Sequence, residues 1–185
     1  MAHDSAHDST ASAATSEAAG ARAPAAAPAA ARPARITVPW VRSRKVADGA
    51  DPLVMVTAYD APGARIADDA GVDMILVGDS LAMVVLGYDD TLSVTVEDMA
   101  HHTAAVARAR PSALVVGDLP WMSYHVSVEE TVRNAAQLIR AGAQCVKLEG
   151  GSKRLTMIEA LIDAETGAIA PAATRTAVSR ADERP

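Results

Sequence analysis

Short apolar runs alternate with amphipathic segments through the middle of this chain. The apolar runs lie at residues 53–60, 74–80, 113–120 and 145–151. They are almost continuous in hydrophobicity, which is typical of strands that are buried on both faces of a parallel sheet. The segments between them carry apolar residues at helical spacing, so the order of elements predicts repeated βα units.

Capping residues mark where the predicted helices begin. Thr95 with Asp98, and Ser127 with Glu130, have the spacing of a capping box,. Thr37 precedes a proline and can cap a short helix,. The longer helices are predicted at residues 64–70, 95–109, 127–141 and 155–164, and residues 81–94 are predicted as a loop that is too long to be a simple turn.

The repeats suit one of two architectures. Four βα units can be half of an eight-stranded barrel or a small doubly wound sheet. Residues 1–35 are rich in Ala and contain repeated Pro without periodicity, so we expect a disordered tail there,. The domain then covers residues 36–165, and residues 166–185 are a divergent tail that we also expect to be disordered.

Composition narrows the function classes. The chain has 185 residues, half of them hydrophobic, and a net charge of −6, which disfavours a nucleic-acid surface,. No apolar run approaches the roughly 20 residues of a membrane span, and we expect a cytoplasmic protein. Cys145 is the only cysteine, so no intrachain disulfide can form, and we expect it to be a small buried hydrophobe,.

Three of the apolar runs end on acidic residues, Asp79, Asp118 and Glu149. Parallel strands place their C-terminal ends at one edge of the sheet, so these carboxylates would meet. Clustered carboxylates repel one another unless a cation lies among them, and a hard divalent metal prefers oxygen ligands. Taken singly, each residue could instead be an ordinary turn or strand-end residue. Lys147 lies inside an apolar run and needs a partner if it is buried,.

Four segments carry a family resemblance. They read VTAYD, VGDSLAMVVLGYDDTLSVTVEDMAHHT, GDLPWMSY and AGAQCVKLEGG. In this order, between about Ile36 and Glu165, they closely resemble the ketopantoate (3-methyl-2-oxobutanoate) hydroxymethyltransferase family. The resemblance implies an α/β fold of the (β/α)8 TIM-barrel type, with about the first four βα units present in this chain, and a homodecamer for the full-length family.

The resemblance also implies a reaction and its site residues. The family transfers a hydroxymethyl group from 5,10-methylenetetrahydrofolate to 3-methyl-2-oxobutanoate, giving 2-dehydropantoate through an enolate that Mg2+ stabilises. By motif match, Asp79 and Asp118 would bind the metal, and Glu149 would join the metal shell directly or through water. Asp79, Ser80, Asp118 and Lys147 would contact the keto acid. No nucleic acid or membrane partner is implied.

The chain departs from the family pattern after about Glu165. The family's fifth strand carries a Gly-His-Leu-Gly-Leu-Thr-Pro motif, and a later glutamate is its proposed base; neither has a counterpart here. No catalytic residue is therefore assigned, and we expect a truncated or frame-shifted chain that is inactive alone. Two alternatives are a Mg-dependent lyase or mutase of 2-oxo acid C–C bonds from a related barrel superfamily, and a non-catalytic half-barrel interaction module.

Overall fold

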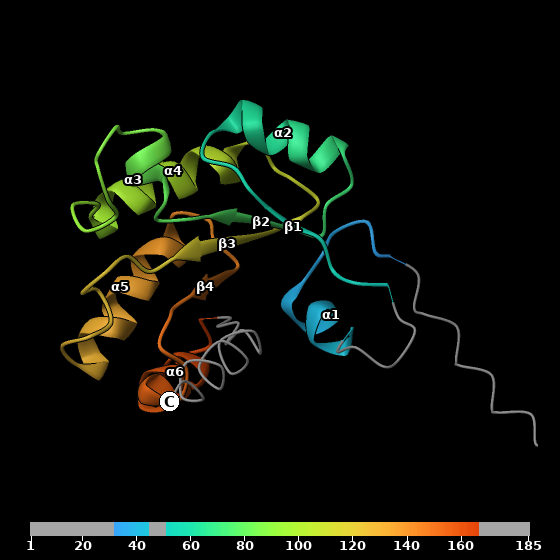
Figure 1. The fold of residues 1–185 in the computed structure, drawn as a ribbon. Coiled ribbons are helices and arrows are strands. Elements are labelled where there is room, and N and C mark those ends of the chain that lie inside the picture. The colour runs from blue at the N-terminus through green and yellow to red at the C-terminus, as the bar shows by residue number, and fades with distance from the viewer. Residues whose placement is uncertain (1–31, 45–50, 167–185) are drawn as a thin grey trace, which may run out of the picture. The chain divides into compact units, whose positions relative to one another are not determined.

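The computed structural model describes residues 32–44 and 51–166. Within them no helix is both long and apolar enough to span a membrane. Most of each predicted disordered tail lies outside the described residues. The elements in chain order are α1 (Val38–Ser43), β1 (Met55–Thr57), α2 (Ala61–Asp69), β2 (Met74–Val77), α3 (Leu81–Val84), α4 (Val96–Arg108), β3 (Leu114–Asp118), α5 (Val128–Arg140), β4 (Cys145–Lys147), the 3-10 turn η1 (Gly151–Arg154) and α6 (Leu155–Asp163) (Figure 1).

The four strands form one parallel sheet in the order β1-β2-β3-β4 (Figure 1). This confirms the predicted βα repeats. A doubly wound sheet reverses its strand order at a switch point, whereas a barrel adds each strand beside the last. The sequential order therefore favours the barrel arrangement. Register is continuous to the C-terminal ends, where Asp118 of β3 lies opposite Lys147 of β4.

Helices α2, α4 and α5 cover one face of the sheet. Strand side chains of that face, among them Ile75, Val115 and Val146, are buried with apolar residues of the helices in the larger core cluster. Their alternation with residues of the other face is the period of two expected of a strand. Strand β3 is buried at all five positions, which explains why it reads as a continuous apolar run rather than as an alternating one,.

The opposite face is partly covered by α1. A smaller core cluster combines Ile36 with Leu114, Val116 and Cys145, and α1 packs against it. Cys145 is fully buried, as predicted. The N–H of Ile36 donates to the carbonyl of Ser112 at 2.8 Å, so the segment before α1 is also fixed by the backbone.

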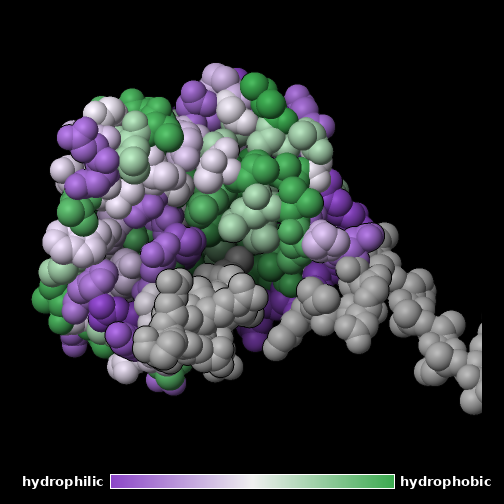
Figure 2. Space-filling model, in the orientation of Figure 1, coloured by the Kyte–Doolittle hydropathy of each residue, from purple (hydrophilic) through white to green (hydrophobic). Residues whose placement is uncertain are grey.

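Strand β1 is one edge of the described sheet and is only partly covered. Val54, Met55 and Val56 are 48%, 47% and 38% exposed. Figure 2 shows hydrophobic surface in the region that Figure 1 places between α2 and α1. Exposed strand edges and apolar surface of this kind are unusual for an isolated sheet, because they invite pairing with another strand.

The structure corrects two of the predicted boundaries. A short helix, α3, replaces the start of the loop predicted at residues 81–94. Helix α2 begins at Ala61 instead of residue 64, because the carboxylate of Asp60 accepts the N–H of Gly63 at 2.7 Å and caps the helix,. The capping box of Thr95 and Asp98 is confirmed. Ser127 caps α5 by accepting the N–H of Glu130 at 3.1 Å.

Gly142, directly after α5, should be essential for stability. Its φ is +111°, and an added Cβ would overlap the Cβ of Ala107 on α4. We expect Gly142→Ala to lower the free energy of unfolding by roughly 2–4 kcal/mol, through backbone strain and steric overlap. Gly87→Ala is the matched control, since Gly87 has φ +78° with open space around it; it should cost only about 1 kcal/mol,. Equal losses in urea unfolding would contradict this account.

The capping box of α4 should make stability depend on pH. The carboxylate of Asp98 accepts the N–H of Thr95 at 3.0 Å, and this bond lowers the pKa of Asp98 below 3.8. The contribution of Asp98 to the free energy of unfolding is therefore fully present above pH 3.8, and it is lost as the pH falls through the lowered pKa of the folded state,. Asp98→Asn should cost about 1 kcal/mol near pH 7, and the difference from wild type should shrink toward about pH 3. Asp89→Asn, in an exposed loop, should show no such trend in denaturant titrations.

Candidate functional site

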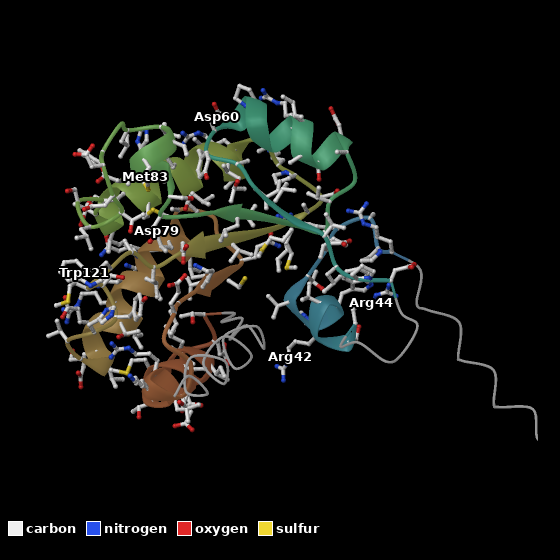
Figure 3. The ribbon with its side chains drawn as sticks, in the orientation of Figure 1. Arg42, Arg44, Asp60, Asp79, Met83 and Trp121 are labelled. Atoms are coloured by element: carbon white, nitrogen blue, oxygen red, sulfur yellow. The ribbon has the colours of Figure 1, made fainter. Side chains whose placement is uncertain are left out.

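Polar side chains gather at the C-terminal ends of β2, β3 and β4. Asp79 follows β2 by two residues, Asp118 ends β3, Lys147 ends β4, and Glu149 follows β4 by two residues. Figure 3 shows Asp79 beyond the arrowhead of β2. All of the acidic residues predicted to cluster are thus placed at one edge of the sheet, which is where parallel strands position functional side chains.

Lys147 is the centre of this cluster. Its ammonium nitrogen lies 2.7 Å and 2.8 Å from the two carboxylate oxygens of Asp118, and 3.2 Å from Oε1 of Glu149. The Asp118 side chain is only 4% exposed, whereas that of Glu149 is 69% exposed. Lys147 therefore has the partner that a lysine inside an apolar run requires, and it offsets the charge of a buried carboxylate.

Asp79 lies beside this ion pair. Its backbone N–H donates to Oδ2 of Asp118 at 3.4 Å. Burial raises the pKa of Asp79, opposed by Lys147 and reinforced by Glu149. Burial also raises the pKa of Asp118 to about 6, with Lys147 opposing it and Asp79 adding to it. Burial and a neighbouring carboxylate therefore disfavour the negative charge of each aspartate, which is the electrostatic condition that additional positive charge would relieve,.

Lys147 itself is held in the charged state. Burial alone would lower the pKa of Lys147, but the carboxylates of Asp118 and Glu149 outweigh burial, so that its pKa is raised. One ammonium thus faces three carboxylates. The arrangement can accept a further cation at the aspartates, or offer the ammonium to an anionic ligand.

Ser80 is positioned by Tyr59. The two hydroxyl oxygens lie 3.0 Å apart, and the carbonyl of Tyr59 accepts a hydrogen bond from Nδ1 of His102 at 2.7 Å. The contact joins the end of β1 to the residue that follows Asp79. The sequence carried no signal for His102, because a histidine in the middle of a helix usually packs or faces solvent.

Tyr124 is a second residue that the sequence did not single out. Its hydroxyl accepts the N–H of Glu149 at 3.4 Å, and the guanidinium of Arg154 lies 5.8 Å from its ring centroid,. Burial raises the pKa of Tyr124, so the hydroxyl keeps its proton. Tyr124 closes the motif GDLPWMSY, and this is the one signal that could have indicated a place near the site.

Within residues 32–44 and 51–166, no three acidic, histidine or cysteine side chains are grouped as ligands of one metal ion. Asp118 and Glu149 both contact the ammonium of Lys147. The predicted ligands are neighbours at the same edge of the sheet, but in this state the ammonium holds two of them.

Comparison with known proteins supports the motif resemblance. Among curated relatives, the 3-methyl-2-oxobutanoate hydroxymethyltransferase of Ignicoccus hospitalis is 63% identical over 112 residues, which are 60% of this chain and 43% of that protein. The enzyme of the same name from Syntrophomonas wolfei is 52% identical over 133 residues, 71% of this chain and 48% of that protein. The chain therefore spans about half the length of the curated relatives it matches.

Solved structures match the fold. A phosphoenolpyruvate phosphomutase from Streptomyces platensis subsp. rosaceus matches with a TM-score of 0.55 at 20% identity, over 70% of this chain and 50% of that chain. A 2,3-dimethylmalate lyase of the PEP mutase/isocitrate lyase superfamily matches with a TM-score of 0.50 at 24% identity, over 62% of this chain and 43% of that chain. At these identities the likeness shows the fold alone: α/β, with part of a (β/α)8 barrel.

The family assignment depends on the sequence rather than on this shared fold. The family model for ketopantoate hydroxymethyltransferase matches residues 35–170, well over half of the chain. That range includes all four strands and every residue of the cluster around Lys147. The chain belongs to the ketopantoate hydroxymethyltransferase family.

Proposed function

We propose that the protein transfers a hydroxymethyl group from 5,10-methylenetetrahydrofolate to 3-methyl-2-oxobutanoate, and that this chain supplies the part of the site that binds the keto acid. The observation that carries the proposal is Lys147, a charged ammonium held at the strand ends by Asp118 and Glu149. The names of the relatives at 52–63% identity support hydroxymethyl transfer to 3-methyl-2-oxobutanoate, and the folate donor is our inference from the motif resemblance. The geometry supplies a cation of the kind that a carboxylate substrate needs.

The residues at the strand ends suit a 2-oxo acid. The ammonium of Lys147 can pair with the substrate carboxylate in place of Glu149, whose side chain is exposed and whose 3.2 Å contact is the longest of the three that the ammonium makes,. The hydroxyl of Ser80 can donate to a substrate oxygen while Tyr59, 3.0 Å away, fixes its orientation. Asp79 and Asp118 lie close enough to contact the same ligand, because they are joined by the Asp79 N–H.

The acidic residues also fit the Mg2+ that the family implies. Asp79 and Asp118 are partly or largely desolvated carboxylates whose pKa values are both raised, chiefly by burial, and carboxylate oxygens are preferred ligands of hard divalent cations,. We assign these two as ligands and Glu149 as a ligand directly or through water. Mg2+ there would polarise the carbonyl group of a bound 2-oxo acid.

Proton removal from C3 of the keto acid is assigned to no described residue. The described histidines near the strand ends have other roles: Nδ1 of His102 donates to the carbonyl of Tyr59, and the ring of His125 packs beside Tyr124. We therefore place the base outside the described residues. Decameric assembly, a cytoplasmic location and inactivity of the chain by itself stay predictions.

Removing the charge of Lys147 should weaken keto-acid binding. We expect Lys147→Met to weaken the binding of 3-methyl-2-oxobutanoate, in the presence of Mg2+, by about 10- to 100-fold, because a charge-assisted bond to the substrate carboxylate is lost. Isothermal titration calorimetry of the 185-residue chain measures this directly. Lys153→Met, in η1, is the matched control and should bind as wild type does.

The uncharged ketone 3-methyl-2-butanone tests the proposed role of the ammonium further. It has the same carbon branching but no carboxylate, so it should not compete with the keto acid for wild type. Binding of the ketone at similar strength, or equal losses in the Lys147 and Lys153 variants, would refute the assignment of Lys147. Circular dichroism on each variant separates lost binding from lost folding.

Mg2+ should raise the thermal stability of the chain through Asp118. A ligand that binds only the folded state stabilises it by mass action, so the melting temperature should rise by roughly 5–10 °C at a cation concentration about 100 times the dissociation constant. We expect Asp118→Asn to remove this rise while Asp69→Asn, on the exposed end of α2, keeps it. A rise that survives in Asp118→Asn would place the cation elsewhere.

A further inference from the structure

A cavity of about 630 Å3 lies between the C-terminal ends of α4 and α5. Helices of βα units run antiparallel to their strands, so this cavity is at the opposite end of the sheet from Lys147. Its volume is within the roughly 300–1,000 Å3 of small-molecule sites. It is lined by three arginines and three alanines: Arg108, Arg110, Arg140, Ala104, Ala107 and Ala141.

The three arginines have no partners in the described part of the chain. All are exposed, and no ion pair or hydrogen bond joins their guanidinium groups to another described residue. No acidic side chain lines the cavity. Three guanidinium groups line one hollow with no carboxylate among them, so an anion placed there would gain charge-assisted bonds,.

The preference for cations at helix C-termini does not explain all three arginines. Arg108 and Arg140 are in the last turns of α4 and α5, where a cation favours the helix dipole,. Arg110 is different, because it lies two residues beyond α4, in the left-handed conformation at φ +54°. Its N–H donates to the carbonyl of Ala107 at 3.0 Å, which fixes the turn that brings the third arginine to the cavity.

The alanines give the cavity an apolar wall. Ala107 of α4 lies against the backbone that follows Ala141, because a Cβ added at Gly142 would clash with the Cβ of Ala107. The cavity therefore combines forked cationic donors with a short apolar surface. A small molecule with a phosphate group and a flat or apolar body matches both features.

We propose that this cavity binds the phosphate group of a small phosphorylated molecule. The guanidinium groups of Arg108, Arg110 and Arg140 hold the phosphate oxygens, and the alanine wall contacts the rest of the ligand. A nucleic acid fits less well, since the chain has a net charge of −6,. The site is separate from the keto-acid site and does not depend on the function proposed for Lys147.

The test is calorimetric titration of the full chain with ADP and, separately, with inorganic phosphate, at low ionic strength so that screening is small. Wild type should bind ADP saturably at one site. The triple variant Arg108→Gln/Arg110→Gln/Arg140→Gln should lose about 100-fold or more in affinity, because each lost charge-assisted bond is worth roughly tenfold. Arg133→Gln, an exposed arginine of α5 outside the cavity, should change binding by less than about twofold.

Comparing the two ligands shows whether the cavity recognises the phosphate group alone or also the rest of the molecule. If inorganic phosphate displaces ADP and binds as tightly, the cavity recognises the phosphate group alone; if ADP binds at least about tenfold more tightly, the alanine wall contributes to recognition. Both results support the site. Absence of saturable binding by either ligand, an unchanged affinity in the triple variant, an equal loss in Arg133→Gln, or saturable binding of duplex DNA alone would overturn it.

Discussion

The ion pair between Lys147 and Asp118 is the interaction on which the functional end of the sheet depends. A parallel sheet brings the ends of β2, β3 and β4 together, and three of the side chains there are acidic. Without Lys147, Asp118, which is almost fully buried, would face Asp79 with no neutralising charge,. The cost of that burial explains why a lysine is placed inside an apolar strand, and why its ammonium is available at the point where an anionic ligand would arrive.

The rest of the fold keeps these strand ends in register. Helices α2, α4 and α5 fix one face of the sheet, and α1 packs on the other against Leu114, Val116 and Cys145. Two tyrosines outside the cluster around Lys147 hold neighbouring residues in place. The hydroxyl of Tyr59 contacts that of Ser80, and the hydroxyl of Tyr124 accepts the N–H of Glu149. The exposed residues of β1 lie at one edge of the described half-barrel. They follow from its strand order, since a barrel covers both edge strands only on closure.

The sequence predicted the features that local chemistry determines. The alternation of strands and helices, the helix starts at Thr95 and Ser127, and the gathering of acidic residues at one edge follow from hydrophobic runs, capping residues and the polarity of parallel strands. The hydrophobic runs left the strand order open between a half-barrel and a doubly wound sheet, and the structure settles it. Helix α3 was missed because four residues are too few to show a period. The contacts of Tyr59, His102 and Tyr124 were not predictable, because each joins two segments that are far apart in the sequence. The pairing of both Asp118 and Glu149 with Lys147, rather than with a common metal position, is likewise a result of side-chain geometry.

We propose that the strand ends around Lys147 bind a 2-oxo acid. The most direct measurement is to record two-dimensional NMR spectra of the 15N-labelled 185-residue chain while 3-methyl-2-oxobutanoate is added with Mg2+. The largest changes in amide chemical shift should fall on Asp79, Ser80, Asp118 and residues 147–149. Little change is expected at α1 or at the C-terminal ends of α4 and α5. Saturating shifts centred on any other region, or none at these residues in a folded sample, would contradict it.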